Sequence, residues 1–509
     1  MASDLKRFRL SNMTGGINTM DEMTKLVQLD SDKKNATAAS EAIDIENFLP
    51  LRRGGQRTER GYEVYKDTGV SAPIRGITKY YEPDGTEHFV LAVGGELYEM
   101  DGAKNLTSIM TVASANYLDF ETAYGQLIVC DASNNARAWD GASVTTVTTD
   151  VAAPRQSRFY LDSLFMYPNN SSFVYYSDVG NIFAGYASNF VKCDNQDGAR
   201  ITAIEKLFVQ SQIETALVVG KETAIGAIIG NGTVDSPFTY IQLNQDAGIT
   251  GFRTMRQNNQ DVTYLTNKGV SSYQFNQQDV NLAYTILTRK VLDQFLGMDT
   301  ATLPDSHTVY DWKNSRIRFF VAEQGYTYPN VVWNFDTEIK CWYKTRYPAQ
   351  ITSSFVDKDG TQWLGTNDGK ILKCTNSLYA FGSSPINAVY KTGFIDFGDP
   401  SVRKRLEDVR IFAQGRDSYS FGVSTRLDYG QKVGSSGTIE LAGADYSWGA
   451  GVWTSDPDVY QWGGTPISLA RFIPGGYFRN IQFIFTGNSS NQPFDIFSIE
   501  FLVQYMGYR

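Results

Sequence analysis

A short pattern recurs through the middle of this 509-residue chain. In each copy, an apolar strand is followed by a turn rich in Gly, Asn or Asp and then by a second strand with alternating apolar positions. These turn residues close tight hairpins, because they accept positive φ angles or bond to their own backbone. The clearest copies are residues 89–102, 126–141, 262–275 and 362–375.

The spacing of the hairpins predicts the fold class. If residues 75–390 hold seven such units, each takes roughly 45 residues, the length of a four-stranded propeller blade. We therefore predict a mostly β protein with a central β-propeller of six or seven degenerate blades. A stacked β-sandwich also has short strands at similar intervals and stays an alternative. Residues 201–232 fit either strands or a helix followed by a strand.

The two ends of the chain differ from the middle in their sequence pattern. Residues 1–70 are mostly polar and predict an extended N-terminal arm or clasp with one short helix, Ala36 to Asn47. Residues 71–390 form the predicted propeller. Residues 391–509 predict a C-terminal antiparallel β domain, a platform or sandwich. Its last hairpin is expected from two alternating strands, residues 480–485 and 496–505, which flank a polar turn.

Charge and cysteine content narrow the function classes. The formal net charge is -9, which argues against a protein whose main task is to coat nucleic acid. No run approaches the ~20 apolar residues of a membrane span, and the first residues lack the apolar core of a secretion signal. Four widely spaced cysteines predict buried free thiols rather than disulfides or zinc ligands: Cys130, Cys193, Cys341 and Cys374.

The sequence shows little that carries catalysis. His88 and His307 have no carboxylate or second histidine at ligand spacing, and no phosphate-binding glycine loop is present. Asp357 and Asp359 resemble the Asp-box of propeller glycosidases, but their spacing departs from it, so we interpret them as turn residues. We expect no enzyme, no cofactor and no metal site.

One segment, LPLRRGGQRTERGY (residues 49–62), is locally basic. Its four arginines flank a Gly-Gly pair, whereas residues 1–62 as a whole are nearly neutral, with ten Lys or Arg and nine Asp or Glu. Their spacing follows neither a helix face nor a strand face. It suits bidentate pairing with carboxylates of a protein partner or of the same chain, rather than DNA. The predicted clasp contacts are Arg52, Arg53, Arg57 and Arg60.

Two pieces of sequence together resemble a known family. The first is GGINT…LRRGG…GY (Gly15 to Tyr62), and the second is KTGFIDFGDPSVRKRLEDVRI (391–411) with the closing PFDIFSIEFLVQYMGYR. They are similar to the ends of bacteriophage tail proteins. With the propeller-like middle, they most resemble the tail nozzle proteins of short-tailed phages, the tail tubular protein B or packaged-DNA stabilisation protein family.

The resemblance implies a structural virion protein of the phage tail, made in the host cytoplasm. It implies a homo-hexameric ring below the tail adaptor, the head-to-tail connector, with tail fibres or spikes docked outside. Genomic DNA would pass through the ring without sequence-specific binding. The ring would retain packaged DNA and open for DNA ejection.

Two other functions stay open. A receptor- or glycan-binding propeller of a tail fibre or adhesin would need an aromatic-lined pocket, and residues 447–462 are the candidate for one. A baseplate or hub component of a long-tailed phage has the same N-terminal signature.

Overall fold

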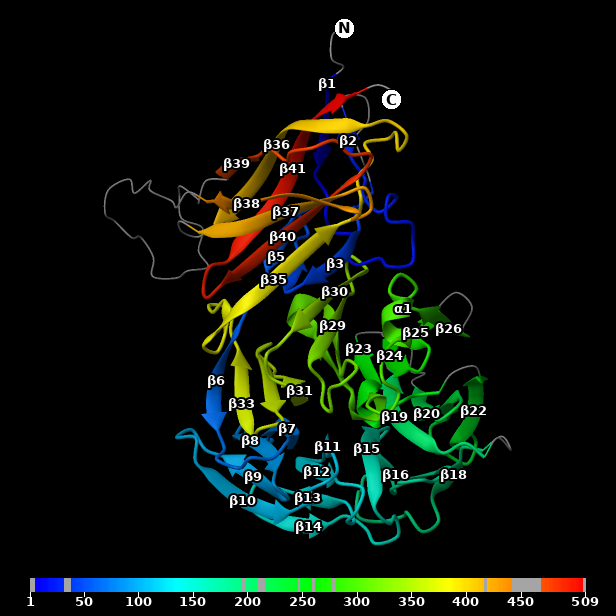
Figure 1. The fold of residues 1–509 in the computed structure, drawn as a ribbon. Coiled ribbons are helices and arrows are strands. Elements are labelled where there is room, and N and C mark those ends of the chain that lie inside the picture. Colours follow the sequence, from blue (N-terminus) through cyan, green and yellow to red (C-terminus); the bar gives the residue numbers. More distant parts are fainter. Residues whose placement is uncertain are drawn as a thin grey trace. The chain divides into compact units, whose positions relative to one another are not determined.

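The computed structural model describes residues 5–31, 38–194, 198–207, 216–245, 248–258, 261–276, 281–415, 419–441 and 468–506. β-strands dominate these residues (Figure 1). The chain divides into two compact units. We call Val64–Val332 with Ala349–Lys373 the propeller unit, and Met1–Glu63 with Trp333–Pro348 and Cys374–Arg509 the sandwich unit.

In the described part of the propeller unit, five four-stranded antiparallel sheets follow one another along the chain. The first two are β7 (Ile74–Tyr81), β8 (Glu87–Val93), β9 (Glu96–Met100) and β10 (Leu106–Thr111), then β11 (Asp119–Ala123), β12 (Gln126–Cys130), β13 (Arg137–Trp139) and β14 (Val144–Thr146). The third is β15 (Pro154–Tyr160), β16 (Ser163–Pro168), β17 (Phe173–Tyr176) and β18 (Phe190–Lys192). The fourth and fifth are β19 (Ile201–Leu207), β20 (Ala216–Lys221), β21 (Ile225–Ile229) and β22 (Thr239–Asn244), then β23 (Arg256–Asn258), β24 (Asp261–Thr266), β25 (Gly269–Asn276) and β26 (Asn281–Ile286).

The last two sheets are assembled differently. The sixth begins with β27 (His307–Asp311) and β28 (Arg316–Val321), and the chain leaves the propeller unit inside the next strand, β29 (Val331–Asp336). The seventh has β31 (Ile351–Val356), β32 (Gln362–Thr366) and β33 (Lys370–Cys374), in that order. Its outer strand is β6 (Tyr62–Asp67), which comes from the N-terminal side of the chain.

The seven sheets close into a ring. The first strand of each sheet contacts the first strand of the next, and β31 contacts β7. Because β6 completes the last sheet, the two ends of the propeller sequence are hydrogen-bonded in one blade. The predicted propeller of six or seven blades is confirmed, with seven blades in the part of the chain that the structure describes, and the sandwich alternative for the middle of the chain is wrong.

Helices are few and short in the described residues. They are α1 (Leu292–Leu296) and the 3-10 turns η1 (Phe252–Thr254), η2 (Leu303–Asp305) and η3 (Trp312–Asn314). The ambiguous segment 201–232 forms the strands β19, β20 and β21 wherever it is described. Its apolar runs are therefore buried strands packed between neighbouring blades.

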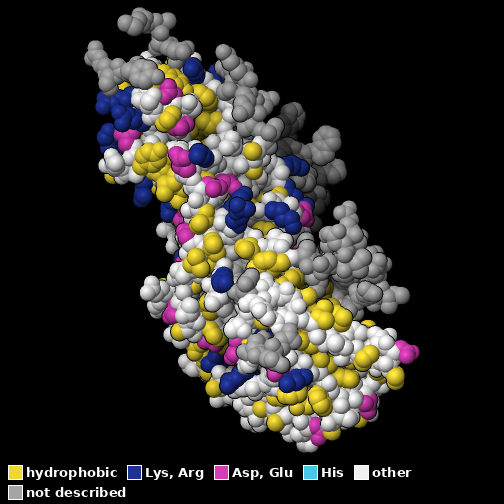
Figure 2. All heavy atoms as spheres, turned by 90° about the vertical axis from the view of Figure 1, so that its right-hand side faces the viewer, with side chains coloured by type: hydrophobic (Ala, Val, Ile, Leu, Met, Phe, Trp, Pro, Cys, Tyr) yellow, Lys and Arg dark blue, Asp and Glu magenta, His cyan; other side chains and the backbone are white. Residues whose placement is uncertain are grey.

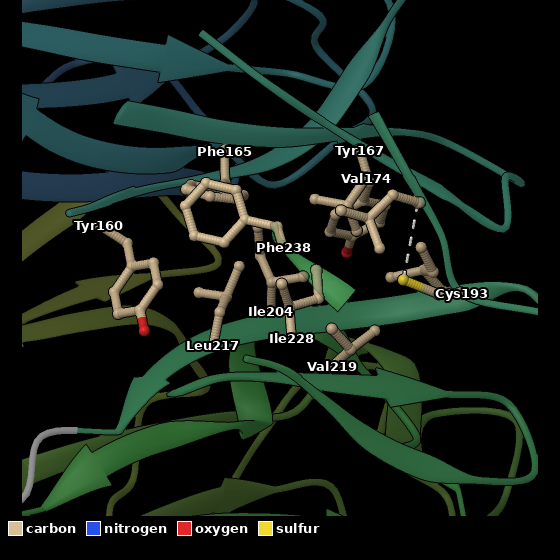
Figure 3. Close-up of a cluster of buried hydrophobic side chains, with 12 residues drawn as sticks. Tyr160, Phe165, Tyr167, Val174, Cys193, Ile204, Leu217, Val219, Ile228 and Phe238 are labelled. Atoms are coloured by element: carbon tan, nitrogen blue, oxygen red, sulfur yellow. Dashed lines mark hydrogen bonds between the residues drawn. The ribbon is translucent and has the colours of Figure 1, made fainter. Parts of the chain in front are cut away.

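Hydrophobic side chains fill the space between successive blades. Figure 3 shows one such cluster, in which aromatic rings of the third blade meet aliphatic side chains of the fourth. Phe165 and Leu217 are both fully buried there. The ring closes in the same way, because Trp363 of the seventh blade packs in one cluster with Phe89 of the first. Burial of this kind is the main stabilising contribution to the propeller.

The sandwich unit is built from strands of both ends of the chain. One sheet has the order β2-β1-β41-β36-β39, and β5 pairs with β41 and with β4. These strands are β2 (Asp30–Ser31), β1 (Leu5–Leu10), β41 (Phe494–Tyr505), β36 (Lys404–Gly415), β39 (Ser468–Phe472), β5 (Gln56–Thr58) and β4 (Phe48–Pro50). The N-terminal strand β1 thus pairs antiparallel along the C-terminal strand β41.

The second sheet of this unit has the order β30-β3-β35-β40-β37-β38. Its strands are β30 (Cys341–Arg346), β3 (Ala42–Glu46), β35 (Ser384–Thr392), β40 (Ile481–Ser489), β37 (Ser420–Leu427) and β38 (Lys432–Glu440), with the short β34 (Ala380–Phe381) paired to β35. Aromatic rings join the two sheets. Phe421 stacks on Phe494 with ring centroids 4.6 Å apart, and Phe483 meets Phe501 at 5.3 Å.

Three details of the sequence interpretation need correction. The predicted helix Ala36–Asn47 is wrong over its described part, because residues 42–46 form β3 and pair with β35. The predicted last hairpin is also wrong, since β40 and β41 belong to different sheets. The predicted segments 1–70, 71–390 and 391–509 differ from the two units, because the arm and the C-terminal region share strand pairings and one core.

Candidate functional site

The basic segment 49–62 forms the hairpin β4–β5 at the edge of β41. Its Gly-Gly pair allows a close approach. Gly54 has a positive φ of 103°, and a Cβ added there would lie 2.7 Å from the carbonyl oxygen of Ser11. A Cβ on Gly55 would lie 2.5 Å from the carbonyl oxygen of Ile496. The glycines therefore let this hairpin seat directly against its neighbours.

Arg57 makes a two-pronged carboxylate contact that is partly buried. Its Nε and Nη2 donate to the Asp495 carboxylate at 2.9 Å and 2.7 Å. The Asp495 side chain is 12% exposed and that of Arg57 is 36% exposed. This is the fork-to-carboxylate geometry that arginine favours. It joins the N-terminal hairpin to the last strand of the chain.

The other three arginines are more open. Arg52 Nη2 lies 2.5 Å from Glu338 Oε1, but both side chains are well exposed, so the pair contributes little. Arg53 is exposed and Arg60 is half-buried. Neither has a side-chain ion pair with any described residue. Of the predicted clasp contacts, Arg52 and Arg57 therefore pair with carboxylates of the same chain. The partners predicted for Arg53 and Arg60 stay a prediction.

His88 has partners that its sequence spacing concealed. Its Nδ1 lies 2.6 Å from Glu99 Oε1, and its Nε2 lies 2.6 Å from Glu82 Oε1. The expectation that this histidine lacks a carboxylate neighbour is wrong, because hairpin pairing brings Glu99 of β9 beside β8. Burial lowers the pKa of His88, but the hydrogen bonds to Glu99 and Glu82 outweigh it and raise the pKa above 6.5. The two carboxylates therefore favour the charged form of this imidazole, which links β8 to Glu82 and Glu99.

Asp357 and Asp359 lie in the turn between β31 and β32, as interpreted from the sequence. Asp359 Oδ1 accepts from the backbone N–H of Thr361 at 2.7 Å, an Asx-type turn. Asp357 does more than close the turn. Its carboxylate accepts from the Tyr81 hydroxyl and pairs with Lys79 at 2.5 Å. It thereby ties the seventh blade to the first.

A polar hollow lies at the inner strands of the propeller. It has a volume of about 120 Å³ and is lined by β7, β11, β23, β27 and β31 together with η1. Arginines and hydroxyls face apolar side chains in it. The lining residues are Arg75, Gly76, Ile77, Thr78, Leu118, Asp119, Phe120, Arg253, Arg256, His307, Thr308, Ser353, Ser354 and Phe355. Five of the seven blades contribute to it, so only ring closure assembles it.

The hollow is electropositive. Arg75 and Arg253 have no ion pair with a described residue, and both guanidinium groups lie over the Tyr117 ring, at 4.6 Å and 3.5 Å. Arg256 reaches Glu205 at 3.5 Å. The Asp119 carboxylate is bound by the buried Arg158 at 3.0 Å. Its negative charge is therefore already compensated.

The pKa values in the hollow reflect burial first and the nearby cations second. Burial, with smaller contributions from Arg155 and Arg256, lowers the pKa of Arg253 to about 10. Burial also holds the pKa of His307 well below 6.5, with Arg253 and Arg256 adding to the effect. His307 is therefore neutral at pH 7 and can donate one N–H and accept at the other ring nitrogen.

Sequence reasoning missed this hollow. His307 was noted without a partner, and Arg253 and Arg256 stand in an unremarkable stretch, FRTMRQ. Arg75 is about 180 positions away from them. The sequence does show a basic residue at the start of an inner strand. Such a residue indicates a binding site only when the strands close into a ring.

Other predicted features have mixed outcomes. The aromatic segment 447–462 lies outside the described residues. The four cysteines are free thiols, three of them buried. Among the residues that the structure describes, no group of three or more His, Cys, Asp or Glu side chains could hold a metal ion. None of the helices in the described parts of the chain has the length and apolarity needed to cross a membrane.

Comparison with known proteins gives similarity in structure only. No protein-family model matches the sequence, and no curated protein matches it. Solved structures of propellers do resemble it. Virginiamycin B lyase from Staphylococcus aureus is 12% identical over 62% of this chain and 99% of its own, with a TM-score of 0.43. The WD40 propeller domain of Doa1 is 11% identical over 62% and 97%, with a TM-score of 0.40.

A third similar structure is PorZ, a surface component of the type-IX secretion system of Porphyromonas gingivalis. It is 11% identical over 67% of this chain and 44% of its own, with a TM-score of 0.38. At these identities the likeness concerns the fold alone. These proteins differ in function, so the comparisons assign none to this chain.

The exclusion of enzymatic activity on sequence grounds is wrong. It rested on missing nucleotide and metal motifs, yet one of the proteins with a similar fold is a lyase. The absence of those motifs does not by itself exclude catalysis, since active sites are built from side chains that the fold brings together. The similarity gives this chain no activity either.

Proposed function

We propose that this protein is a ring-forming structural component of a bacteriophage tail, the nozzle of a short-tailed phage. One observation carries the proposal. The two sequence pieces that resemble the nozzle family stand at opposite ends of the chain, and they fold into one β-sandwich. β5 from the first piece pairs with β41 from the second, and β1, which lies just before the first piece, pairs with β41 as well.

This pairing supports the resemblance because it makes the two pieces one structural unit. Short, moderately specific motifs that match by chance would have no reason to meet in the fold. Here Arg57 of LRRGG…GY bonds to Asp495 of PFDIF. The matched residues thus lie in contact, as expected of segments that are kept together by a common task.

The arginine segment then has two roles in the proposal. Arg57 holds the hairpin to β41 within the chain. Arg53, which is exposed and has no ion pair with a described residue, is available for a carboxylate of the next subunit or of the tail adaptor. An exposed arginine of this kind affects association more than the stability of its own chain.

The first test is the mass of the purified full-length chain. We expect light scattering to report a hexamer of the 56.8 kDa chain, either alone or on mixing with the adaptor protein of the same phage. Electron micrographs of that species should show six-fold rings. A species that stays monomeric or trimeric with and without the adaptor would contradict the nozzle. Rings that form without affinity for the adaptor would favour the hub of a long-tailed phage.

A charge reversal tests the clasp separately. Arg53→Glu should weaken ring formation or adaptor binding about tenfold and leave thermal unfolding of the single chain unchanged. Arg289→Glu is the matched control, because Arg289 is also exposed but lies in the propeller unit. If both variants assemble like the wild type, the segment has no role in assembly, and the ring proposal then rests on the mass measurement alone.

A further inference from the structure

The polar hollow of the propeller contains an unusual number of unsatisfied polar atoms. Arg253 is 5% exposed and His307 is 4% exposed, yet Arg253 Nε and both ring nitrogens of His307 have no hydrogen-bond partner among the described residues. The same holds for three hydroxyls and for Arg75 Nε. These hydroxyls belong to Thr308, Ser353 and Ser354. Leaving a buried polar atom without a partner is unfavourable, so these atoms favour binding of a polar ligand.

Most of these atoms are hydrogen-bond donors. Two other donors of Arg253 are committed, because Nη1 donates to the Thr352 carbonyl at 2.7 Å and Nη2 donates to the Asp305 carbonyl at 2.6 Å. These bonds hold the guanidinium against the Tyr117 ring with its Nε left free. His307 is fixed in a similar way by its stack on Phe320, with ring centroids 4.4 Å apart. The donors are therefore pre-positioned rather than mobile.

The hollow also has apolar lining. Ile77, Leu118, Phe120 and Phe355 line it together with the cationic groups. Its volume of about 120 Å³ suits a small ligand, and small-molecule sites combine apolar walls with a few convergent polar groups in this way.

We propose that the hollow binds a small organic oxyanion, with its carboxylate or similar group held by Arg75, Arg253 and Arg256 and its apolar body against Phe120 and Phe355. The hydroxyls and the neutral His307 complete the hydrogen bonds. The argument uses only the propeller unit, so it is independent of a role in a phage tail. Binding here would link inner strands of five blades and stabilise the closed ring.

Benzoate is a suitable probe, because it carries a carboxylate on an apolar ring. Inorganic phosphate and benzyl alcohol separate the two halves of the proposal, since one lacks the apolar body and the other lacks the charge. Calorimetric titration of the full-length chain should show saturable 1:1 binding of benzoate and at least tenfold weaker binding of the other two.

Two variants locate the site. Arg256→Gln removes one cation of the hollow, and Ser354→Ala removes a hydroxyl that has no partner to lose. We expect benzoate affinity to fall about tenfold in the first and severalfold in the second. Arg289→Gln removes an exposed cation elsewhere in the propeller unit and should leave affinity within twofold. Ser354→Ala keeps the test valid if Arg256→Gln folds poorly.

Several results would overturn the proposal. They are no saturable binding of benzoate, equal binding of benzyl alcohol, or equal benzoate affinity in the wild type, Ser354→Ala and Arg289→Gln. If phosphate bound as tightly as benzoate, the apolar walls would contribute nothing to binding, and the hollow would be a simple anion site.

Discussion

Arg57 and Asp495, 438 positions apart, form a two-pronged ion pair between the second strand of the arginine hairpin and the first residues of β41. The pair is half-buried, and its geometry is fixed on both sides by strand pairing. Through Arg57 the basic segment therefore has a structural task within its own unit. It fastens the N-terminal region to the end of the chain.

Removing this pair should destabilise the chain. Arg57→Ala leaves the largely buried Asp495 carboxylate without its charged donor, and we expect a loss of about 1–2 kcal/mol in the free energy of unfolding, reduced from a fully buried pair by the exposure of Arg57. Urea unfolding of the full chain measures it. Arg53→Ala is the control and should change stability by less than about 0.5 kcal/mol. Equal stability of both variants would mean that the pair contributes nothing.

The two histidines should titrate on opposite sides of 6.5. The pKa of His88 is raised by Glu99 and Glu82 against the effect of burial, whereas burial and two arginines lower that of His307. NMR of the histidine-labelled chain shows this directly, because the sequence has only 2 His. His88 should titrate above pH 6.5, and His307 should stay neutral down to well below it. Two titrations near 6.5 would contradict both environments.

The charge on His88 also makes stability depend on pH. Because its pKa is raised in the folded state, its contribution is fully present below pH 6.5 and disappears as pH rises through the folded pKa. The destabilisation caused by His88→Gln should therefore be larger at pH 6 than at pH 9. Denaturant unfolding of both proteins at the two pH values measures the difference. An unchanged or inverted difference would show that the imidazole is not charged when folded.

Gly61 should not tolerate a side chain. A Cβ there would lie 1.9 Å from the carbonyl oxygen of Ala380, so Gly61→Ala must push apart two backbone segments of the sandwich unit. We expect a loss of at least about 2 kcal/mol or failure to fold. Gly102→Ala is the matched control, because nothing lies within 4 Å of its added Cβ. Thermal unfolding compares the two, and similar midpoints would argue against the tight contact.

The packing between blades makes a separate prediction. Phe165 is fully buried between the third and fourth blades, where it meets Phe238 edge to face at 5.1 Å (Figure 3). Phe165→Ala should lower the free energy of unfolding by about 3–5 kcal/mol. Val234→Ala serves as the control, because Val234 is 98% exposed. Loss of near-UV circular dichroism on heating reports the change, and a small effect would mean that the cluster repacks.

Charged side chains are unevenly distributed over the surface. On the face drawn in Figure 2, basic and acidic side chains lie among uncharged and apolar atoms, with Lys and Arg more frequent on the sandwich unit. An overall charge of -9 therefore does not describe every part of the surface. Local charge decides what each part attracts.

The sequence alone determined the local elements. Hairpins such as β8–β9 and β32–β33 could be read from their turn residues and alternating apolar positions, because both depend on neighbouring residues. The blade length followed from the repeat spacing. The turn role of Asp359 was also readable, since an Asx turn involves only the next two residues.

Only the tertiary structure decided what distant strands do. β6 completes the seventh blade, and β1 and β5 join β41, because pairings across hundreds of residues depend on shape and burial rather than local pattern. For the same reason Arg75 and Arg253 lie over the same Tyr117 ring without a sequence signal. The hollow exists because ring closure places inner strands of five blades around one space, and no single strand encodes that arrangement.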